Sequence, residues 1–284
     1  GGSSVIDTKG NVKLDAVNVG YQSNSIGDAN NYFKQGESAD IGSQLRGNDD
    51  IIIKSGNNIN GTAVDINSSK GTVGIMADGN VDFKEGRNKQ NLSTANKSTS
   101  KGFLSKTTTQ NRFDMQSDNA ISSNIEGNKV IVQAGQDINF TGTNAISDSG
   151  TQLTAGRDVN ILAAENTSSE SSFSQTKKSG LFGTSGGFGF TIGKQQSDDS
   201  NAKTARTHSA SKVGAIDGNV IIDAGGNYQQ TGSNIVAGMG ADSNKDITDP
   251  DRGNTVIRAQ NINIDNTMNV YTNQSEQKFK QSGL

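Results

Sequence analysis

A short pattern of alternating apolar and polar positions occurs twice in succession between Gly127 and Ala163. The first copy is VQAGQDINF at residues 132–140, and the second is LTAGRDVNI at residues 153–161, so every position keeps an offset of 21 residues. Apolar side chains alternate with polar ones on both sides of a corner of small residues. Each copy therefore predicts a strand, a turn and a second strand.

One such coil cannot bury its apolar side chains alone, but it can when it stacks on a second copy of itself. A coil of this length built from short strands predicts a solenoid of the parallel β-helix type. The predicted core ladder stacks four residues of the first coil beneath four of the second: Val132, Ala134, Ile138 and Phe140 beneath Leu153, Ala155, Val159 and Ile161.

The corner pattern appears seven times along the chain, and its copies come in pairs. A long polar stretch follows each pair, at about residues 18–46, 84–126 and 165–217. The predicted repeat is therefore two coils and one excursion. We expect a single β-helix segment over residues 1–284, cut from a longer chain, with these approximate units: 5–46 (partial), 47–126, 127–217 and 218–284 (partial).

Composition agrees with a solenoid better than with a globular core. Apolar residues make up 30% of the 284 residues and aromatic residues only 5%, and a β-helix needs only a thin apolar ladder along its axis. The net charge of −3 lacks the basic excess of nucleic-acid binders. With no cysteine, the chain has no thiolate metal site, and we expect no cofactor, no nucleic acid and no small-molecule substrate.

The third excursion contains an apolar cluster within KSGLFGTSGGFGFTIGK, residues 178–194. Alternating apolar residues around two glycines predict a β-hairpin from Leu181 to Ile192. The candidate membrane or partner contact is formed by five residues: Leu181, Phe182, Phe188, Phe190 and Ile192. Lysines flank this cluster, so it suits either the surface of an anionic membrane or packing against the flank of the β-helix.

Paired AGxD[IV] coils followed by a Ser/Thr-rich excursion with SGLFG and GFGFTIG resemble the haemagglutinin repeats of filamentous haemagglutinin-like exoproteins. The similarity is closest to the second repeat region of contact-dependent growth inhibition effectors, and it covers essentially the whole chain. It implies a right-handed β-helix that is secreted to the bacterial cell surface by a two-partner (type V) system. The implied partners are the outer-membrane transporter of that system and the outer membrane or surface of a target cell.

The resemblance implies a structural segment that takes part in toxin delivery across the target-cell outer membrane. Adhesins share related repeats, so an adhesin shaft that binds host glycan or protein is an alternative. A carbohydrate-active β-helix enzyme is a second alternative, for which Asp137 and Asp158 occupy equivalent corners. Asn11 and Asn58 take the same corner in other coils, and an acid/base pair does not tolerate that exchange, so we expect no enzyme.

Two further candidates for chemistry lack supporting residues. His208 is the one histidine and lies in a polar excursion without a nucleophile motif. Residues 242–246 read DSNKD, like the start of a calcium loop, but Ile247 and Gly253 stand where an EF-hand has Gly and Glu. We expect a solvated loop histidine and no metal site.

Overall fold

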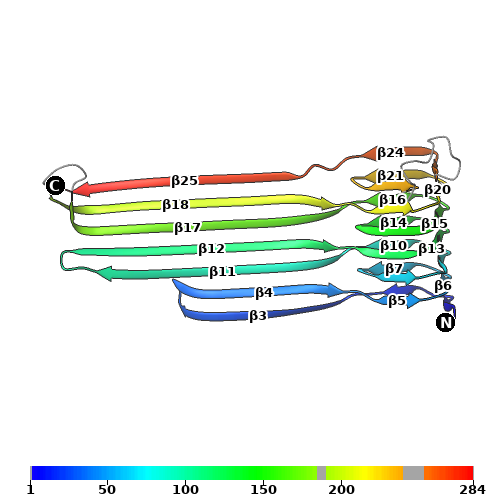
Figure 1. Ribbon diagram of the computed structural model, residues 1–284, viewed down its shortest axis with the longest axis horizontal. Coiled ribbons are helices and arrows are strands. Elements are labelled where there is room, and N and C mark those ends of the chain that lie inside the picture. Colours follow the sequence, from blue (N-terminus) through cyan, green and yellow to red (C-terminus); the bar gives the residue numbers. More distant parts are fainter. Residues whose placement is uncertain (1, 184–189, 239–252, 284) are drawn as a thin grey trace.

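The computed structural model describes residues 2–183, 190–238 and 253–283, and most of them lie in β-strands. The strands form a stack of coils, which we call the shaft, and a set of long hairpins that extend from one side of it (Figure 1). The described residues contain no helix long and apolar enough to span a membrane.

Each coil of the shaft has three short strands separated by turns. In one coil these are β6 (Ile51–Ser55), β7 (Ile59–Thr62) and β8 (Asp65–Ser68). The next coil places β9 (Thr72–Ala77) on β6 and β10 (Val81–Lys84) on β7, always in parallel. The polar–apolar alternation turns one side of every strand inward, and so the stack shares one core.

Two parallel sheets run along the shaft. The seven-stranded sheet follows the order β2 (Val12–Leu14), β7, β10, β14 (Ile138–Thr141), β16 (Val159–Leu162), β21 (Asn227–Thr231), β24 (Asn261–Asp265). The eleven-stranded sheet holds β6, β8 and β9 together with β1 (Ser4–Thr8), β5 (Gln44–Gly47), β13 (Ser123–Ala134), β15 (Thr143–Ala155), β19 (Lys212–Ala215), β20 (Asn219–Ala224), β22 (Asn234–Ala237) and β23 (Thr255–Arg258).

The proposed core ladder lies at the centre of this stack. Val132 pairs with Leu153 and Ala134 with Ala155, and in the neighbouring sheet Ile138 pairs with Val159 and Phe140 with Ile161. The two alanines are 4–7% exposed, and the other six side chains are fully buried. Phe140 also meets Phe83 of the preceding coil edge to face, with ring centroids 6.0 Å apart.

The excursions form a third sheet, which we call the hairpin sheet. It is antiparallel, with the order β25, β18, β17, β12, β11, β4, β3. The strand bounds are β3 (Val17–Asp28), β4 (Asn31–Ile41), β11 (Gly86–Lys101), β12 (Ser105–Ile121), β17 (Ala164–Gly183), β18 (Phe190–Ser209) and β25 (Val270–Gly283). The strands point away from the shaft as a single layer (Figure 1).

The hairpins pair with each other because the paired coils set the correct spacing. Hairpins leave the shaft after β2, β10 and β16, and the coils between them, through β7 and β14, turn back directly. Successive hairpins are therefore two coils apart, which is roughly 9.4–9.8 Å at the usual strand spacing. A hairpin is itself two strands wide. Neighbouring hairpins thus meet at hydrogen-bonding distance and pair, as β12 does with β17 over 14 residue pairs from Ser105↔Gly180 to Asp118↔Thr167.

The residue after the second strand has a left-handed backbone in the coils that turn back directly. In the coils that turn back, Ala63, Gly142 and Gly232 occupy this vertex with φ of +52°, +55° and +57°. Glycine adopts this left-handed conformation without steric cost. Where the chain leaves as the second hairpin, the buried Ser123 connects the point of return to the coil. Its Oγ donates to the carbonyl of Lys84 at 2.7 Å and accepts from the amide of Val64 at 3.0 Å.

The prediction of a parallel β-helix with long hairpin excursions after each pair of coils is confirmed. The excursions are regular strands and not irregular polar loops. Their Ser, Thr, Asn and Gln residues form continuous strands of up to 20 residues.

The buried ladder generates a first prediction. Ile138→Asp places a carboxylate in a fully buried position, losing about 1.5–3 kcal/mol of apolar burial and adding the cost of burying a charge. We expect a lower melting temperature by circular dichroism and loss of amide protection in the adjoining coils. Gln133→Asp is the matched control, because Gln133 is exposed on the neighbouring strand. Equal melting of the two variants would contradict this coil register.

The spacing of the hairpins generates a second prediction. Ile51 pairs with Val73, so deleting residues 51–72 removes one coil and keeps the shaft in register. The first two hairpins then lie one coil apart, about 4.8 Å, which is too close for two hairpins side by side. We expect the amides of β4 and β11 to lose their protection in hydrogen-exchange mass spectrometry.

The control is deletion of residues 51–129, a whole repeat, since Val73 pairs in turn with Val130. This deletion keeps the two-coil spacing and brings β4 beside β17, so protection of β4 should persist. Protection of β4 in the one-coil deletion would contradict the spacing argument.

Candidate binding face at the hairpin ends

The corner aspartates belong to a ladder of side chains that runs along the shaft. The side-chain oxygen of each residue accepts a hydrogen bond from the backbone amide of the equivalent residue in the next coil: Asn11 from Asn58 (3.1 Å), Asn58 from Asn80 (2.8 Å), Asn80 from Asp137 (3.1 Å), Asp137 from Asp158 (3.2 Å) and Asp158 from Asn227 (2.7 Å). Asn and Asp both supply this acceptor, which explains why they interchange.

Asp137 has one further partner, the side chain of Arg157, whose Nε donates to its Oδ1 at 2.6 Å and whose second guanidinium nitrogen bonds Oδ2. The hydrogen bond from Arg157 is the main cause that holds the pKa of Asp137 below its ordinary value of 3.8, against the effect of burial. Asp137 therefore binds an arginine and an amide, which is a structural arrangement and differs from a general acid beside a general base.

The other candidates for chemistry are His208 and the calcium-like stretch. His208 lies on β18, and its Nδ1 is 3.3 Å from the side-chain oxygen of Asn269. The calcium-like stretch, residues 242–246, lies outside the described residues. Among the residues that the structure does describe, no group of three or more His, Cys, Asp or Glu side chains could hold a metal ion.

The apolar cluster lies at the end of the hairpin sheet that is farthest from the shaft. Ala164 pairs with Ser209 at the base of the hairpin, and Leu181 pairs with Ile192 near its end. The 20 residues of β17 place that end about 68 Å from the base, at roughly 3.4 Å per residue. For Leu181 and Ile192, the interpretation in which this cluster packs on the flank of the β-helix is therefore wrong.

The structure brings part of the proposed contact together. Phe182 lies on β17 and Phe190 on β18, paired with Thr191 and Gly183, and Phe188 is outside the described residues. Ile192 is 69% exposed, and the neighbouring hairpin adds Phe103 and Leu104, which are 100% and 60% exposed. The amide of Leu181 donates to the carbonyl of Leu104 at 3.0 Å, so the two hairpin ends are joined.

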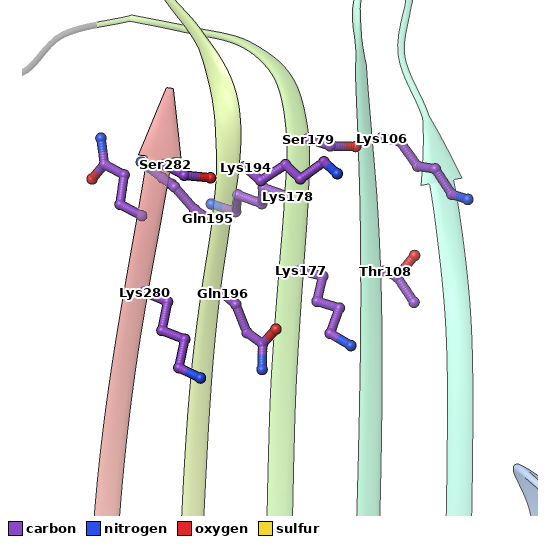
Figure 2. A pocket seen from close by; sticks show the side chains of 11 residues that line it. Lys106, Thr108, Lys177, Lys178, Ser179, Lys194, Gln195, Gln196, Lys280 and Ser282 are labelled. Carbon is purple, nitrogen blue, oxygen red and sulfur yellow. The ribbon is translucent and has the colours of Figure 1, made fainter. Parts of the chain in front are cut away.

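Beside this apolar end, one face of the sheet carries a lattice of lysines, which we call the lysine face. Residues directly opposite each other across antiparallel strands project to the same side. One row across β12, β17, β18 and β25 is Lys106, Ser179, Lys194, Ser282, and the next row is Thr108, Lys177, Gln196, Lys280. The lysines alternate with neutral polar residues and line a groove of about 540 Å³ (Figure 2).

These four lysines have no acidic partner within 4.0 Å among the described residues. The nearest acid on the same face is Asp198, one row closer to the shaft. It accepts hydrogen bonds from Gln196 at 2.6 Å and Gln175 at 2.8 Å, and the first of these is the main cause that lowers its pKa. Lys177 and Lys280 also lower the pKa of Asp198 through their charge but form no ion pair with it. Most of the positive charge of the face is therefore available to an external anion.

The two faces of the sheet differ in charge at this end. The intervening row projects to the opposite face and holds Thr107, Lys178, Gln195 and Gln281, with one lysine. Leu181 and Ile192 have the same alternation as Lys177 and Lys194, and so they continue the lysine face outward as an apolar row.

Comparison with known proteins agrees with this architecture. The hemagglutinin repeat family matches residues 104–248, which include the second strand of the second hairpin, β12, the third hairpin and the coils between them. The chain belongs to the hemagglutinin repeat family. No solved structure matches it significantly.

Several relatives of this hemagglutinin repeat chain are named as nucleases. It is 29% identical to tRNA nuclease CdiA-2 of Burkholderia pseudomallei over 291 aligned positions, covering 100% of this chain and 9% of the relative. It is 37% identical to tRNA nuclease CdiA of Escherichia coli (61% of the chain, 5% of the relative) and 40% identical to 16S rRNA endonuclease CdiA of Enterobacter cloacae (52% and 5%). The chain thus spans a tenth or less of these three proteins.

These matches identify the repeat region of CdiA-type proteins of contact-dependent growth inhibition, a recognition that the coil and excursion motifs had already indicated. The chain is a segment of a secreted, surface-exposed exoprotein. Its repeats form the shaft and the hairpin sheet described above.

The corner ladder generates a third prediction. Asp137→Asn keeps the acceptor for the amide of Asp158 but loses the charge that binds Arg157, so stability should fall by about 0.5–1 kcal/mol at pH 7. Because the folded-state pKa of Asp137 is lowered, the charge contributes fully above about pH 4 and is lost as pH falls through the folded pKa. The difference between parent and variant should therefore vanish at low pH.

Chemical denaturation at several pH values measures this difference. Asp148→Asn serves as the control, because Asp148 is exposed and makes no side-chain ion pair in the described residues. A stability loss that is independent of pH, or a loss far beyond 1 kcal/mol, would rule out the ion pair as the cause.

Proposed function

We propose that this chain is a non-enzymatic structural and delivery segment, which takes part in moving a toxin across the outer membrane of a target cell. The relatives are named as nucleases, and the chain matches only 5–9% of those three proteins. Their nuclease activity is accordingly assigned to a part outside this repeat region.

The observation that carries the proposal is the exposed end of the hairpin sheet. A shaft that served only as a spacer would need nothing beyond its buried apolar ladder and a polar surface. This chain in addition projects Phe103, Leu104 and Ile192 into solvent beside lysines, far from the shaft. Exposed apolar side chains gathered at one place are typical of a surface that meets a membrane or another protein.

The absence of an enzyme role rests on the residues that would have to act. Asp137 is held by Arg157 and by the amide of Asp158, and His208 has an asparagine as its side-chain partner. The corner position also accepts Asn in four other coils, Asn11, Asn58, Asn80 and Asn227, which suits a structural acceptor.

The partners that we assign follow from the same proposal. One is the outer-membrane transporter of a two-partner secretion system, and the other is the surface of the target cell. We further propose that the working unit is two coils and one hairpin, with boundaries close to residues 5–46, 47–126, 127–217 and 218–284. Each unit then adds one hairpin to the sheet.

A hairpin deletion in the full-length parent protein tests this function. Gly86 and Ile121 face each other at the base of the second hairpin, so residues 87–120 can be replaced by an Asn-Gly turn. We expect export to the cell surface and attachment of target cells to persist, because the shaft is intact. Growth inhibition of target cells in a mixed culture should fall by at least tenfold.

The three readouts separate the alternatives. Loss of target-cell attachment with normal export would favour an adhesin. Unchanged inhibition would show that the hairpin is not needed for delivery and would overturn the proposal. Asp137→Asn in the same parent protein is the matched control and should leave all three readouts unchanged.

A further inference from the structure

We propose that the lysine face binds the phosphate groups of a lipid bilayer surface, while the apolar row beside it enters the boundary between headgroups and acyl chains. This inference rests on the proposed delivery function and names the chemical partner of the same site. It draws on charge, spacing and the position of the apolar side chains.

The charge lattice fits a surface of closely spaced anions. Lys106 and Lys194 share a row and are separated by one strand, and so are Lys177 and Lys280 in the next row. At the usual strand spacing the lysines repeat about every 8–10 Å, which resembles the spacing of lipid headgroups. Ser179, Gln196 and Ser282 lie between them and add neutral hydrogen-bond donors for phosphate oxygens.

The lattice is assembled from three successive excursions. β12, β17 with β18, and β25 each contribute lysines, and the pairing between hairpins brings them together. Figure 2 shows the two rows crossing these strands. A single hairpin would present at most two of these four charges, and so the site depends on the two-coil spacing of the shaft.

The apolar row decides between a bilayer and a soluble polyanion. Leu181 and Ile192 continue the lysine face outward, and Lys194 follows Ile192 by two residues, about 7 Å along the strand. An element that enters a bilayer surface places apolar side chains roughly 5–10 Å into the headgroup and acyl boundary. Lysines at this distance lie at the level of the phosphates, whereas a soluble polyanion makes no use of exposed Leu104 and Ile192.

Vesicle binding by the purified chain tests the inference. The probes are vesicles of phosphatidylcholine alone and of phosphatidylcholine mixed with phosphatidylglycerol. Each lysine near an anionic bilayer contributes a factor of about five to partitioning. Four independent contributions multiply to roughly 600-fold, so we expect the quadruple variant Lys106→Gln, Lys177→Gln, Lys194→Gln, Lys280→Gln to bind the anionic vesicles at least about 100-fold more weakly than the parent chain.

A matched control removes four exposed lysines elsewhere on the chain: Lys34→Gln, Lys84→Gln, Lys203→Gln and Lys212→Gln. It should bind the anionic vesicles within a few-fold of the parent chain. Circular dichroism of both variants checks that the fold is kept. Equal vesicle binding by the quadruple variant and this control would overturn the inference.

The exposed apolar side chains beside the lysine face are tested by Leu104→Ser with Ile192→Ser, against Val19→Ser with Val270→Ser, which are exposed apolar residues near the shaft. The first pair should weaken binding that survives high salt, and the second should not. Heparin and inositol hexakisphosphate serve as soluble polyanions. Binding to them as tight as to anionic vesicles, with no effect of Leu104→Ser and Ile192→Ser, would identify a soluble polyanion instead and overturn the bilayer.

The two proposals can fail separately. Absence of vesicle binding overturns the lipid inference and leaves the delivery function to the cell assay. Unchanged growth inhibition after the hairpin deletion overturns the delivery function, and a vesicle result would still describe what the lysine face binds.

Discussion

The structure depends on one equality of dimensions: two coils of the shaft rise by the same distance that one hairpin occupies. Parallel pairing sets the rise of a coil, and antiparallel pairing sets the width of a hairpin, at the same interstrand spacing of about 4.8 Å. One coil turns back directly and the next one leads into a hairpin. Because these two kinds of coil alternate along the shaft, neighbouring hairpins fit edge to edge. Without this equality, the excursions would be separate hairpins with unpaired backbone, and long isolated hairpins are marginally stable in water.

The shaft was predictable because its signal is local and repeated. The 21-residue offset between Val132 and Leu153 indicates the coil and its register, and the pairing of these residues agrees with it. The excursions carry no such signal, because a strand is recognised by apolar alternation, and their cross-strand partners are residues such as Thr109 and Thr176. One indication was present: the excursions contain no proline, as paired strands require.

The candidate site was predictable only in part, for a related reason. The apolar cluster around Leu181 and Ile192 is contiguous enough to indicate a hairpin. Lys106 and Lys280 are far apart in the sequence and come together only through pairing between hairpins. The sequence KGFL at residues 101–104 resembles KSGLF at residues 178–182, so the hairpin ends share a composition. This similarity does not show that the ends align in space. The exchange of Asp and Asn at the corner argued against an acid/base pair, and the ladder between coils gives these residues a structural role.

Because the hairpins are long, a small rotation between successive coils of the shaft produces a large displacement at the hairpin ends. Adjacent strands of an ordinary sheet are rotated by roughly 20–25°. At the end of an arm of about 68 Å, each degree of rotation between neighbouring hairpins displaces their ends by about 1.2 Å. Pairing that persists from Asp118↔Thr167 near the shaft to Ser105↔Gly180 near the end thus requires a shaft that scarcely rotates from coil to coil. A small torque on the shaft would accordingly open the sheet from its outer end, where the lysines lie.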